Sequence, residues 1–406
     1  WPRLCIVTRG AQDCCGQAAA PSPAQAAVVG LARAVEAEVP ELDCVCVDLD
    51  PDATAGAASG EAEAMAVVSE ALAQRNGSGF EREQLVCVRA GRRFVGRVDR
   101  LAQGPAAVAQ PPPPFTLPAG TYVVTGGAGG LGLAFCGWLA RSGAGRVVAV
   151  GRREDPGAAA ATAMAEISRD VGCEVSYASA DVSDAAQLRC ALLGAAAGTK
   201  GALRGVLHCA GVLDDAAIAK QDRARLRRVF EPKVAGSWNL HEFFSGKDAD
   251  GRAAAATAAT TADVFVLFSS VSALLGAFGQ ANYAAANAFM DGLARLRAHR
   301  GLAALSVRWG VWGDVGMAAG PLARALERGG HVSLRPETGV RSLEYLLRRA
   351  GRTCADPAVF DVRWETILAR LARPQALLSR MAAVAWGEAA ASAQARVREP
   401  AGAAAR

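Results

Sequence analysis

The sequence has 406 residues, more than one ordinary hydrophobic core holds, so we expect two domains or subdomains. Its formal net charge is +5, and its arginines are scattered without interleaved aromatic residues, which argues against a nucleic-acid-binding protein. Hydrophobic residues make up 51% of the chain, much of it alanine, yet no stretch of 18 unbroken apolar residues predicts a membrane span.

Eleven cysteines occur at irregular spacing, with only four histidines. No Cys-x-x-Cys pair meets a second one, so we expect neither a metal site nor a disulfide framework. Free thiols indicate a reducing compartment, the cytoplasm. The chain starts at Trp1 without a signal-like segment, and we interpret it as a piece of a longer polypeptide.

The first quarter of the chain is predicted as a small α/β unit. Its first strand runs into RGAQD, where we align Arg9 with a position at which a nucleotide-binding turn needs glycine. We therefore expect this part to bind no nucleotide, whether it arose by duplication or by convergence of short strand motifs. The expected strands lie at 4–8, 43–49, 84–89 and 93–98, and the helices at 23–38 and 61–74.

Four consecutive prolines in QPPPPF (110–115) divide the chain, because they continue neither helix nor sheet. We predict a structural subdomain at 1–110, a connector at 111–118, a catalytic subdomain at 119–385 and an alanine-rich linker at 386–406. Residues 246–263, GKDADGRAAAATAATTAD, have no apolar period and are predicted to be a surface insertion.

Six strands are expected after the connector, alternating with amphipathic stretches. This rhythm predicts an α/β fold with a doubly wound parallel sheet of Rossmann type, preceded by the smaller degenerate Rossmann-like subdomain. The strands are expected at 121–125, 146–150, 173–178, 204–208, 263–268 and 303–308.

A glycine loop, TYVVTGGAGGLG, joins the first of these strands to a helix whose amides could hold phosphate oxygens. The next strand ends in VVAVGRRE. Arg152 and Arg153 there favour a ribose 2′-phosphate and hence NADPH over NADH, the alternative being two solvated arginines. For Asp181, in SADVSD, we expect one of two roles or both: capping a helix, and accepting a hydrogen bond from the adenine amine. The arginines at 223–228 are expected to form a solvated helix face.

The stretch FVLFSSVSALLGAFGQANYAAANAFMD predicts a catalytic group. Tyr283 and Asn287 are four apart and share a helix face, and Ser270, thirteen residues before Tyr283, falls at the end of a strand, where doubly wound sheets bind ligands. A free tyrosine has a pKa of about 10, so it needs a nearby cation. Lys233, in FEPKVAGSWNLHE, is one of only four lysines in the chain.

The sequence resembles the ketoreductase domain of modular type I polyketide synthases, a branch of the short-chain dehydrogenase/reductases. The resemblance extends to about residue 385 and includes the N-terminal part, from LCIVTRGAQ to CVCVDLD, which resembles that family's degenerate structural subdomain. The classical Tyr-x-x-x-Lys is replaced by Tyr-x-x-x-Asn, with the lysine at 233, a change typical of the polyketide branch. The matching stretches also include GVLHCAGVLDD, EPKVAGSWNLHE and LSVRWGVWGDVGMA.

The resemblance implies NADPH-dependent reduction of a β-ketoacyl thioester held on the phosphopantetheine arm of an acyl carrier protein. Neighbouring synthase domains are the other implied partners. Tyr283 would donate a proton, Ser270 would hydrogen-bond the same oxygen, and Lys233 would depress the pKa of Tyr283. Asn287 would anchor Lys233 or a water. Residues 309–328 occupy the place of the family's substrate lid.

The triplet Leu213-Asp214-Asp215 resembles the class of this family that forms the D-configured hydroxyl. The opposite class carries tryptophan eight residues before the tyrosine, where this chain has Leu275. The alternative is that Asp214 or Asp215 only caps the following helix. Gln280 and Met317 complete the predicted substrate residues. The predicted cofactor residues are Thr125, Gly126, Gly127, Gly129, Gly130, Leu131, Gly132, Arg152, Arg153, Asp181, Val182, Ala210 and Gly211.

Two other functions stay open on the sequence. A non-catalytic scaffold would keep the fold without binding NADPH. A free-standing short-chain dehydrogenase acting on a sugar or steroid would need neither the degenerate first part nor the proline connector, and would begin with methionine.

Overall fold

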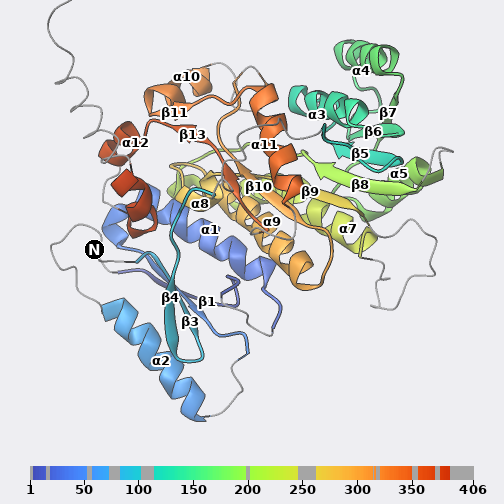
Figure 1. Cartoon of the computed structure of the whole chain (residues 1–406). Helices are drawn as coiled ribbons and strands as arrows, with labels where there is room; N and C mark the ends of the chain where they lie inside the picture. The colour runs from blue at the N-terminus through green and yellow to red at the C-terminus, as the bar shows by residue number, and fades with distance from the viewer. Residues whose placement is uncertain are drawn as a thin grey trace, which may run out of the picture.

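The computed structural model arranges the chain as two sheets with their helices (Figure 1). The prolines at 111–113, most of the predicted insertion and the predicted linker lie outside the described residues, as does Met317. The structure describes residues 3–14, 19–52, 57–72, 83–101, 114–197, 202–245, 262–313, 315–316, 321–349, 355–370 and 375–384.

The smaller sheet belongs to residues 3–101, which we call the N-terminal unit. Three parallel strands are followed by one antiparallel strand, in the order β1-β2-β3-β4. Every predicted strand and helix of this unit is present, with ends that differ by at most four residues. The elements are β1 (Cys5–Arg9), α1 (Pro23–Glu38), β2 (Val45–Leu49), α2 (Ala57–Leu72), β3 (Leu85–Arg89) and β4 (Arg92–Val95).

The larger sheet has seven parallel strands in the order β12-β10-β9-β8-β5-β6-β7. Successive strands spread to either side of the β5–β8 pair, which makes that pair the switch point, where doubly wound sheets bind ligands. Its strands are β5 (Thr121–Thr125), β6 (Arg146–Gly151), β7 (Glu174–Ser179), β8 (Leu203–His208), β9 (Val264–Ser270), β10 (Leu305–Trp309) and β12 (Ala358–Val359).

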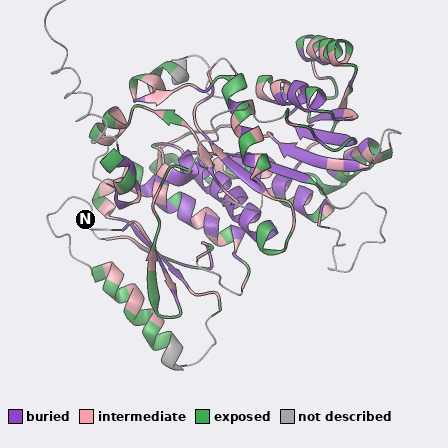
Figure 2. Cartoon of the chain, viewed as in Figure 1, coloured by how far each residue is buried: buried purple, intermediate pink, exposed green. Residues whose placement is uncertain are grey.

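Helices cover both faces of the larger sheet, so its central strands are buried on both sides, as Figure 2 shows in purple. Val124 packs with α3 (Gly130–Arg141), α4 (Ala158–Val171) and α11 (Pro336–Arg348) on one face. Its neighbour Val123 packs with α5 (Ala185–Ala197), α7 (Gly236–Phe243) and α9 (Ala281–His299) on the other. Other elements are α6 (Arg223–Phe230), α8 (Ser272–Leu275), α10 (Pro321–Arg328), α12 (Trp364–Arg370), β11 (His331–Val332) and β13 (Asp361–Val362).

The two sheets are connected by α1 of the N-terminal unit, which lies directly against α9 (Figure 1). Glycine on each helix permits the close approach. A Cβ at Gly30 would lie 2.5 Å from the carbonyl oxygen of Ala284, and one at Gly292 would lie 2.7 Å from Cβ of Ala26. Because Tyr283 precedes Ala284 on α9, the N-terminal unit supports the helix that carries the predicted catalytic tyrosine.

Candidate active site

The glycine loop forms a tight turn between β5 and α3. Gly126 has φ of +68°, a conformation that glycine adopts without strain. A Cβ at Gly132 would lie 2.3 Å from the carbonyl oxygen of Gly126, and one at Gly127 would lie 2.6 Å from Cβ of Ala149. The first turn of α3 can therefore approach the strand ends closely, with unpaired amides directed at a ligand.

A cleft of about 580 Å³ lies above this turn, at the carboxyl ends of the strands. It is lined by most of the predicted cofactor residues, namely Gly126, Gly129, Gly130, Leu131, Gly132, Arg152, Arg153, Val182, Ala210 and Gly211. Thr125 and Gly127 are not in its lining. Thr125 lies behind it, with its hydroxyl 2.7 Å from Nδ1 of buried His208, and so ties β5 to β8.

The two arginines after β6 differ in their partners. The Arg153 guanidinium donates to the carbonyl of Pro156 at 2.8 Å, and the carbonyl of Arg153 accepts from the Tyr177 hydroxyl at 2.6 Å. Arg152 is exposed, lines the cleft and has no ion pair with any described residue. Of the two, Arg152 is the one whose guanidinium has no hydrogen bond or ion pair among the described residues, and its phosphate role stays a prediction.

Asp181 forms a local turn and is not the helix cap. Its carboxylate accepts from the amide and the hydroxyl of Ser183, at 2.8 and 2.7 Å. Asp184 caps α5 instead, accepting from the amides of Ala186 and Gln187 at 2.9 and 3.0 Å. Asp181 is not in the cleft lining, although Val182 beside it is. The capping role predicted for Asp181 is therefore wrong, because the turn places Asp184 at the helix end.

Ser270, Tyr283 and Lys233 come together at the inner end of the cleft. Ser270 is the last residue of β9, and Tyr283 lies in the first turn of α9. Lys233 belongs to a π-helical turn, Glu231–Ala235, of a kind that often marks functional sites. Its Nζ donates to the carbonyl of Phe268 at 3.1 Å and lies 5.1 Å from the centroid of the Tyr283 ring.

Burial dominates the electrostatics of this group. It raises the pKa of Tyr283 to about 12, and the nearby polar side chains of Asn287 and Ser270 offset this rise only in part. Burial also lowers the pKa of Lys233 to about 8. Lys233 is not among the causes of this shift, so its expected lowering of the Tyr283 pKa stays a prediction, while desolvation of the phenolate sets the net direction.

Asn287 supports the backbone of α9 and does not hold Lys233. Its Nδ2 donates to the carbonyl of Tyr283 at 2.8 Å, whereas Lys233 is held by the carbonyl of Phe268. The Oδ1 of Asn287 is buried and has no partner among the described residues. Of the two predicted roles, anchoring Lys233 is wrong, and an acceptor for a water stays a prediction.

A second cavity, of about 550 Å³, adjoins the first. Both cavities are lined by Ser270 and Tyr283, so these two residues lie where the cavities meet. Leu213, Asp215 and Gln280 line the second cavity, and their role as substrate residues stays a prediction; Gln280 donates to Asp215 at 2.9 Å. Burial raises the pKa of Asp215.

Asp214 points away from both cavities. It accepts from Arg225 and, at 2.7 Å, from Arg228. The expected solvated arginine face is thus only partly correct, because two arginines of α6 hold this aspartate. The helix cap is Asp222, which accepts from the amide of Arg225 at 2.8 Å. Neither Asp214 nor Asp215 is the cap, so that alternative is wrong.

The second cavity also has walls that the sequence did not predict. Ala37, Pro40 and Gln84 come from the N-terminal unit, and Gln375 comes from near the end of the described chain. No motif surrounds these residues, so only the packing of α1 on α9 could have revealed them. Leu326 of α10, within the range 309–328 expected for a lid, and His331 of β11 also line the cavity.

The turn after β1 repeats the geometry of the glycine loop in a different register from the one we aligned. Gly10, with φ of +66°, donates to the carbonyl of Leu49 at 3.1 Å, just as Gly126 donates to that of Val150 at 2.8 Å. Gly10, rather than Arg9, is therefore the counterpart of Gly126. The predicted alignment paired Thr8 with Thr125 and is wrong by one residue. Strand β1 extends to Arg9, so Arg9 is the counterpart of Thr125.

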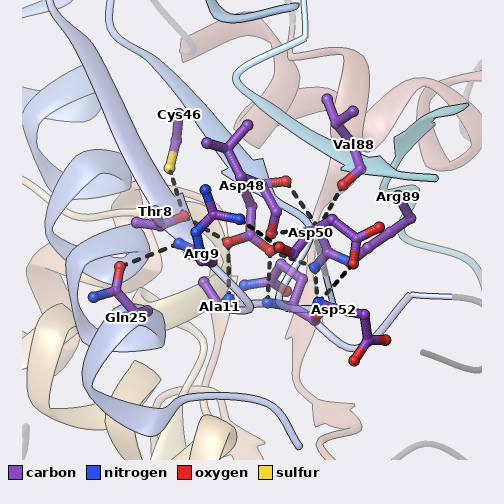
Figure 3. A network of polar contacts seen from close by, with 12 residues as sticks. Thr8, Arg9, Ala11, Gln25, Cys46, Asp48, Asp50, Asp52, Val88 and Arg89 are labelled. Carbon is purple, nitrogen blue, oxygen red and sulfur yellow. Dashed lines mark hydrogen bonds and ion pairs between the residues drawn. The ribbon is translucent and has the colours of Figure 1, made fainter. Parts of the chain in front are cut away.

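The following amides of this turn are occupied by a carboxylate of the protein itself (Figure 3). Asp48 of β2 is fully buried and accepts from the amides of Ala11 and Gln12 at 2.8 and 3.0 Å, and from the hydroxyl of Thr8 at 2.8 Å. Arg89 of β3 pairs with it at 2.6 Å. An internal carboxylate thus occupies the amides of this turn, whereas Gly127, the counterpart of Ala11 in the other turn, donates to the carbonyl of Val150 at 3.3 Å.

Comparisons with known proteins agree with this geometry. Residues 120–314 match the family described as KR domain, and residues 2–98 match the Rossmann fold domain of the polyketide synthase extender module SpnB. Polyketide synthase GfsB of Streptomyces halstedii is 36% identical over 367 residues. That alignment covers 90% of this chain but only 6% of GfsB.

Solved structures extend the match to almost the whole chain. One, described as A-type ketoreductases from a modular polyketide synthase, has 31% sequence identity and a TM-score of 0.75, covering 93% of this chain and 73% of its own. The first ketoreductase of the tylosin synthase has 33% identity and a TM-score of 0.72, covering 93% and 74%. The chain therefore belongs to the ketoreductases of modular polyketide synthases.

Proposed function

We propose that this chain reduces the β-keto group of an acyl thioester with NADPH, forming the β-hydroxyacyl thioester during polyketide chain extension. One observation carries the proposal. Ser270 and Tyr283 line both the glycine-loop cleft and the second cavity, so a carbonyl held between them can face both a cofactor and an acyl chain.

The cleft fits a nicotinamide dinucleotide. Gly126 and Gly132 leave no room for side chains, so the amides at the start of α3 can contact a diphosphate. Arg152 supports NADPH over NADH, because a guanidinium directly after β6 that pairs with no carboxylate in the described part of the chain suits a 2′-phosphate. When bound, NADPH supplies the hydride.

The residues of the chain then supply the proton and fix the carbonyl. Tyr283, whose pKa of about 12 keeps it protonated, donates its phenolic proton to the oxygen of the former carbonyl. Ser270 donates a hydrogen bond to the same oxygen, which stabilises the developing negative charge. Lys233 places a positive charge beside the phenol ring, and this charge stabilises the phenolate that forms as the proton leaves Tyr283.

The substrate would arrive on the phosphopantetheine arm of an acyl carrier protein, in a polypeptide with neighbouring synthase domains. The chain spans only 6% of GfsB and 17% of a mycobacterial phthiocerol synthase subunit, which supports a place inside a longer synthase. No helix in the described ranges combines the length and apolarity needed to cross a membrane.

A direct test measures NADPH oxidation with a β-ketoacyl N-acetylcysteamine thioester. Tyr283→Phe should reduce turnover by roughly 10²-fold or more and leave NADPH affinity, followed by fluorescence, unchanged. Tyr345→Phe, on the surface helix α11, is the matched control and should behave as the wild type. A Tyr283→Phe variant that retains more than a tenth of the wild-type rate would refute the mechanism. A wild-type chain that binds no NADPH would favour a non-catalytic scaffold.

We also propose that the product carries the D-configured hydroxyl. The support is that Leu213 and Asp215 line the second cavity. Leu275, which stands where the opposite class has tryptophan, lines the same cavity. Chiral chromatography of the product from a carrier-bound, unbranched β-ketoacyl substrate tests this. A predominant L-alcohol would contradict the assignment.

A further inference from the structure

Two loops form the wall of the second cavity beside Tyr283. The first, residues 209–217, carries Leu213 and Asp215, and the second, residues 276–280, precedes α9. They are joined directly, since the amide of Ala216 donates to the carbonyl of Gly279 at 2.8 Å. Gln280 adds a side-chain hydrogen bond to Asp215.

A single carboxylate from the N-terminal unit holds the second loop and Ile218, the residue directly after the first loop. Glu38, the last residue of α1, accepts from the amide of Ile218 through Oε1 at 2.5 Å and from the amide of Gly279 through Oε2 at 3.0 Å. Gly279 has φ of +75° and is thus held at its N–H by Glu38 and at its carbonyl by Ala216.

The surroundings of Glu38 give this contact a fixed geometry. Ile218 packs against apolar residues of α1, and Ala34 of α1 is buried with Ala281 and Ala284 of α9. Ala37 and Pro40, on either side of Glu38, line the second cavity themselves. The carboxylate therefore extends from a helix that is rigidly packed on α9 and lies at the cavity wall.

We propose that Glu38 is a positioning residue, which sets the relative place of the two loops and through them the pose of the acyl thioester. The expected effect on the acyl thioester rests on the proposed function. The expected effect on the two loops does not depend on it. A charge-assisted hydrogen bond contributes more than a neutral one, so the loss of two such bonds should loosen both loops. The N-terminal unit would thereby contribute to the facial selectivity of the reduction.

The test compares Glu38→Ala and Glu38→Gln with the wild-type full chain. Glu41→Ala is the matched control, since Glu41 is an exposed carboxylate only three residues away. Hydrogen exchange should quicken on the order of tenfold at the amides of Ile218 and Gly279 in Glu38→Ala, and less in Glu38→Gln, which keeps one acceptor. Thermal unfolding of each variant shows whether it is folded.

Kinetics with a carrier-bound β-ketoacyl thioester then gives the functional readout. For Glu38→Ala we expect KM for this substrate to rise about tenfold and the minor hydroxyl enantiomer to increase, with the dissociation constant of NADPH unchanged within about twofold. Glu38→Gln should lie between this variant and the wild type, and Glu41→Ala should match the wild type.

Three outcomes would overturn the inference. The first is a folded Glu38→Ala variant with wild-type exchange at both amides. The second is faster exchange with unchanged KM and enantiomer ratio. The third is an effect of equal size in Glu41→Ala. A wild-type chain that reduces no β-ketoacyl thioester would refute the proposed function instead, and faster exchange in Glu38→Ala would still support the positioning of the loops.

Discussion

Raising the assay pH from about 7 to about 9.5 tests the role of Lys233. Its ammonium group is buried, donates to the carbonyl of Phe268 and has its pKa lowered to about 8 by burial. Its neighbours do not titrate in this range. Burial lowers the pKa of His208 to about 3, raises that of Tyr283 to about 12 and raises that of Cys209 well above its usual value.

The size of the effect follows from the pKa of Lys233. At a pKa of about 8, roughly nine-tenths of the side chain is charged at pH 7 and about one-tenth at pH 9. The charged form is the one that stabilises Tyr283 as its proton leaves. We therefore expect kcat/KM for the thioester to be level below pH 8 and to fall about tenfold per pH unit above it.

Initial rates of NADPH oxidation at saturating NADPH measure this profile, and circular dichroism at each pH shows that the fold persists. Lys233→Arg is the control, because a guanidinium stays charged throughout the range. Its residual activity should show no break below about pH 10. A wild-type profile that is level to pH 9.5, or a break near pH 8 that persists in Lys233→Arg, would refute the assignment.

Three further changes test other contacts. Arg152→Ala should raise KM for NADPH and leave KM for NADH nearly unchanged, since a charge-assisted phosphate contact contributes about 1.5–3 kcal/mol; equal effects on both would exclude the 2′-phosphate role. Asp48→Asn should lower the free energy of unfolding in urea by about 3–5 kcal/mol, because Arg89 would keep a buried charge without its partner. Gly30→Ala should cost about 1–3 kcal/mol in the same assay and reduce turnover, because the new Cβ would press on the carbonyl of Ala284, the residue after Tyr283.

The elements that carry the site could be predicted because their signals are local. Local sequence patterns predicted six strands of the seven-stranded larger sheet, all except β12, with ends within two residues of those expected. A spacing of four placed Tyr283 and Asn287 on one helix, and a strand followed by two serines placed Ser270 at its end. The carboxyl ends of parallel strands meet at one edge, so the order of elements was enough to locate the cleft.

The chemistry within the site could not be predicted in the same way, because it depends on burial and on partners distant in the sequence. The pKa of Tyr283 follows from desolvation, which no spacing reports. Lys233 is held by a carbonyl of β9 that lies 35 residues further along the chain. Glu38 contacts Gly279 across 241 residues, and the helix that carries it has mostly small residues and no motif.

The two similar turns of this chain differ in the acceptor that is available to their backbone amides. In the larger sheet, the residue of β6 that packs on the turn is Ala149, which is small and uncharged and leaves the α3 amides to a ligand's phosphate. In the N-terminal unit, the residue at the corresponding place, one before Leu49, is Asp48, and its carboxylate already accepts from the turn. A second anion there would meet a buried negative charge as well as occupied donors, so bound nucleotide is disfavoured twice over. The carboxylate instead joins β1, β2 and, through Arg89, β3 into one framework. The same unit carries α1, whose Glu38 lies beside residues that line the second cavity.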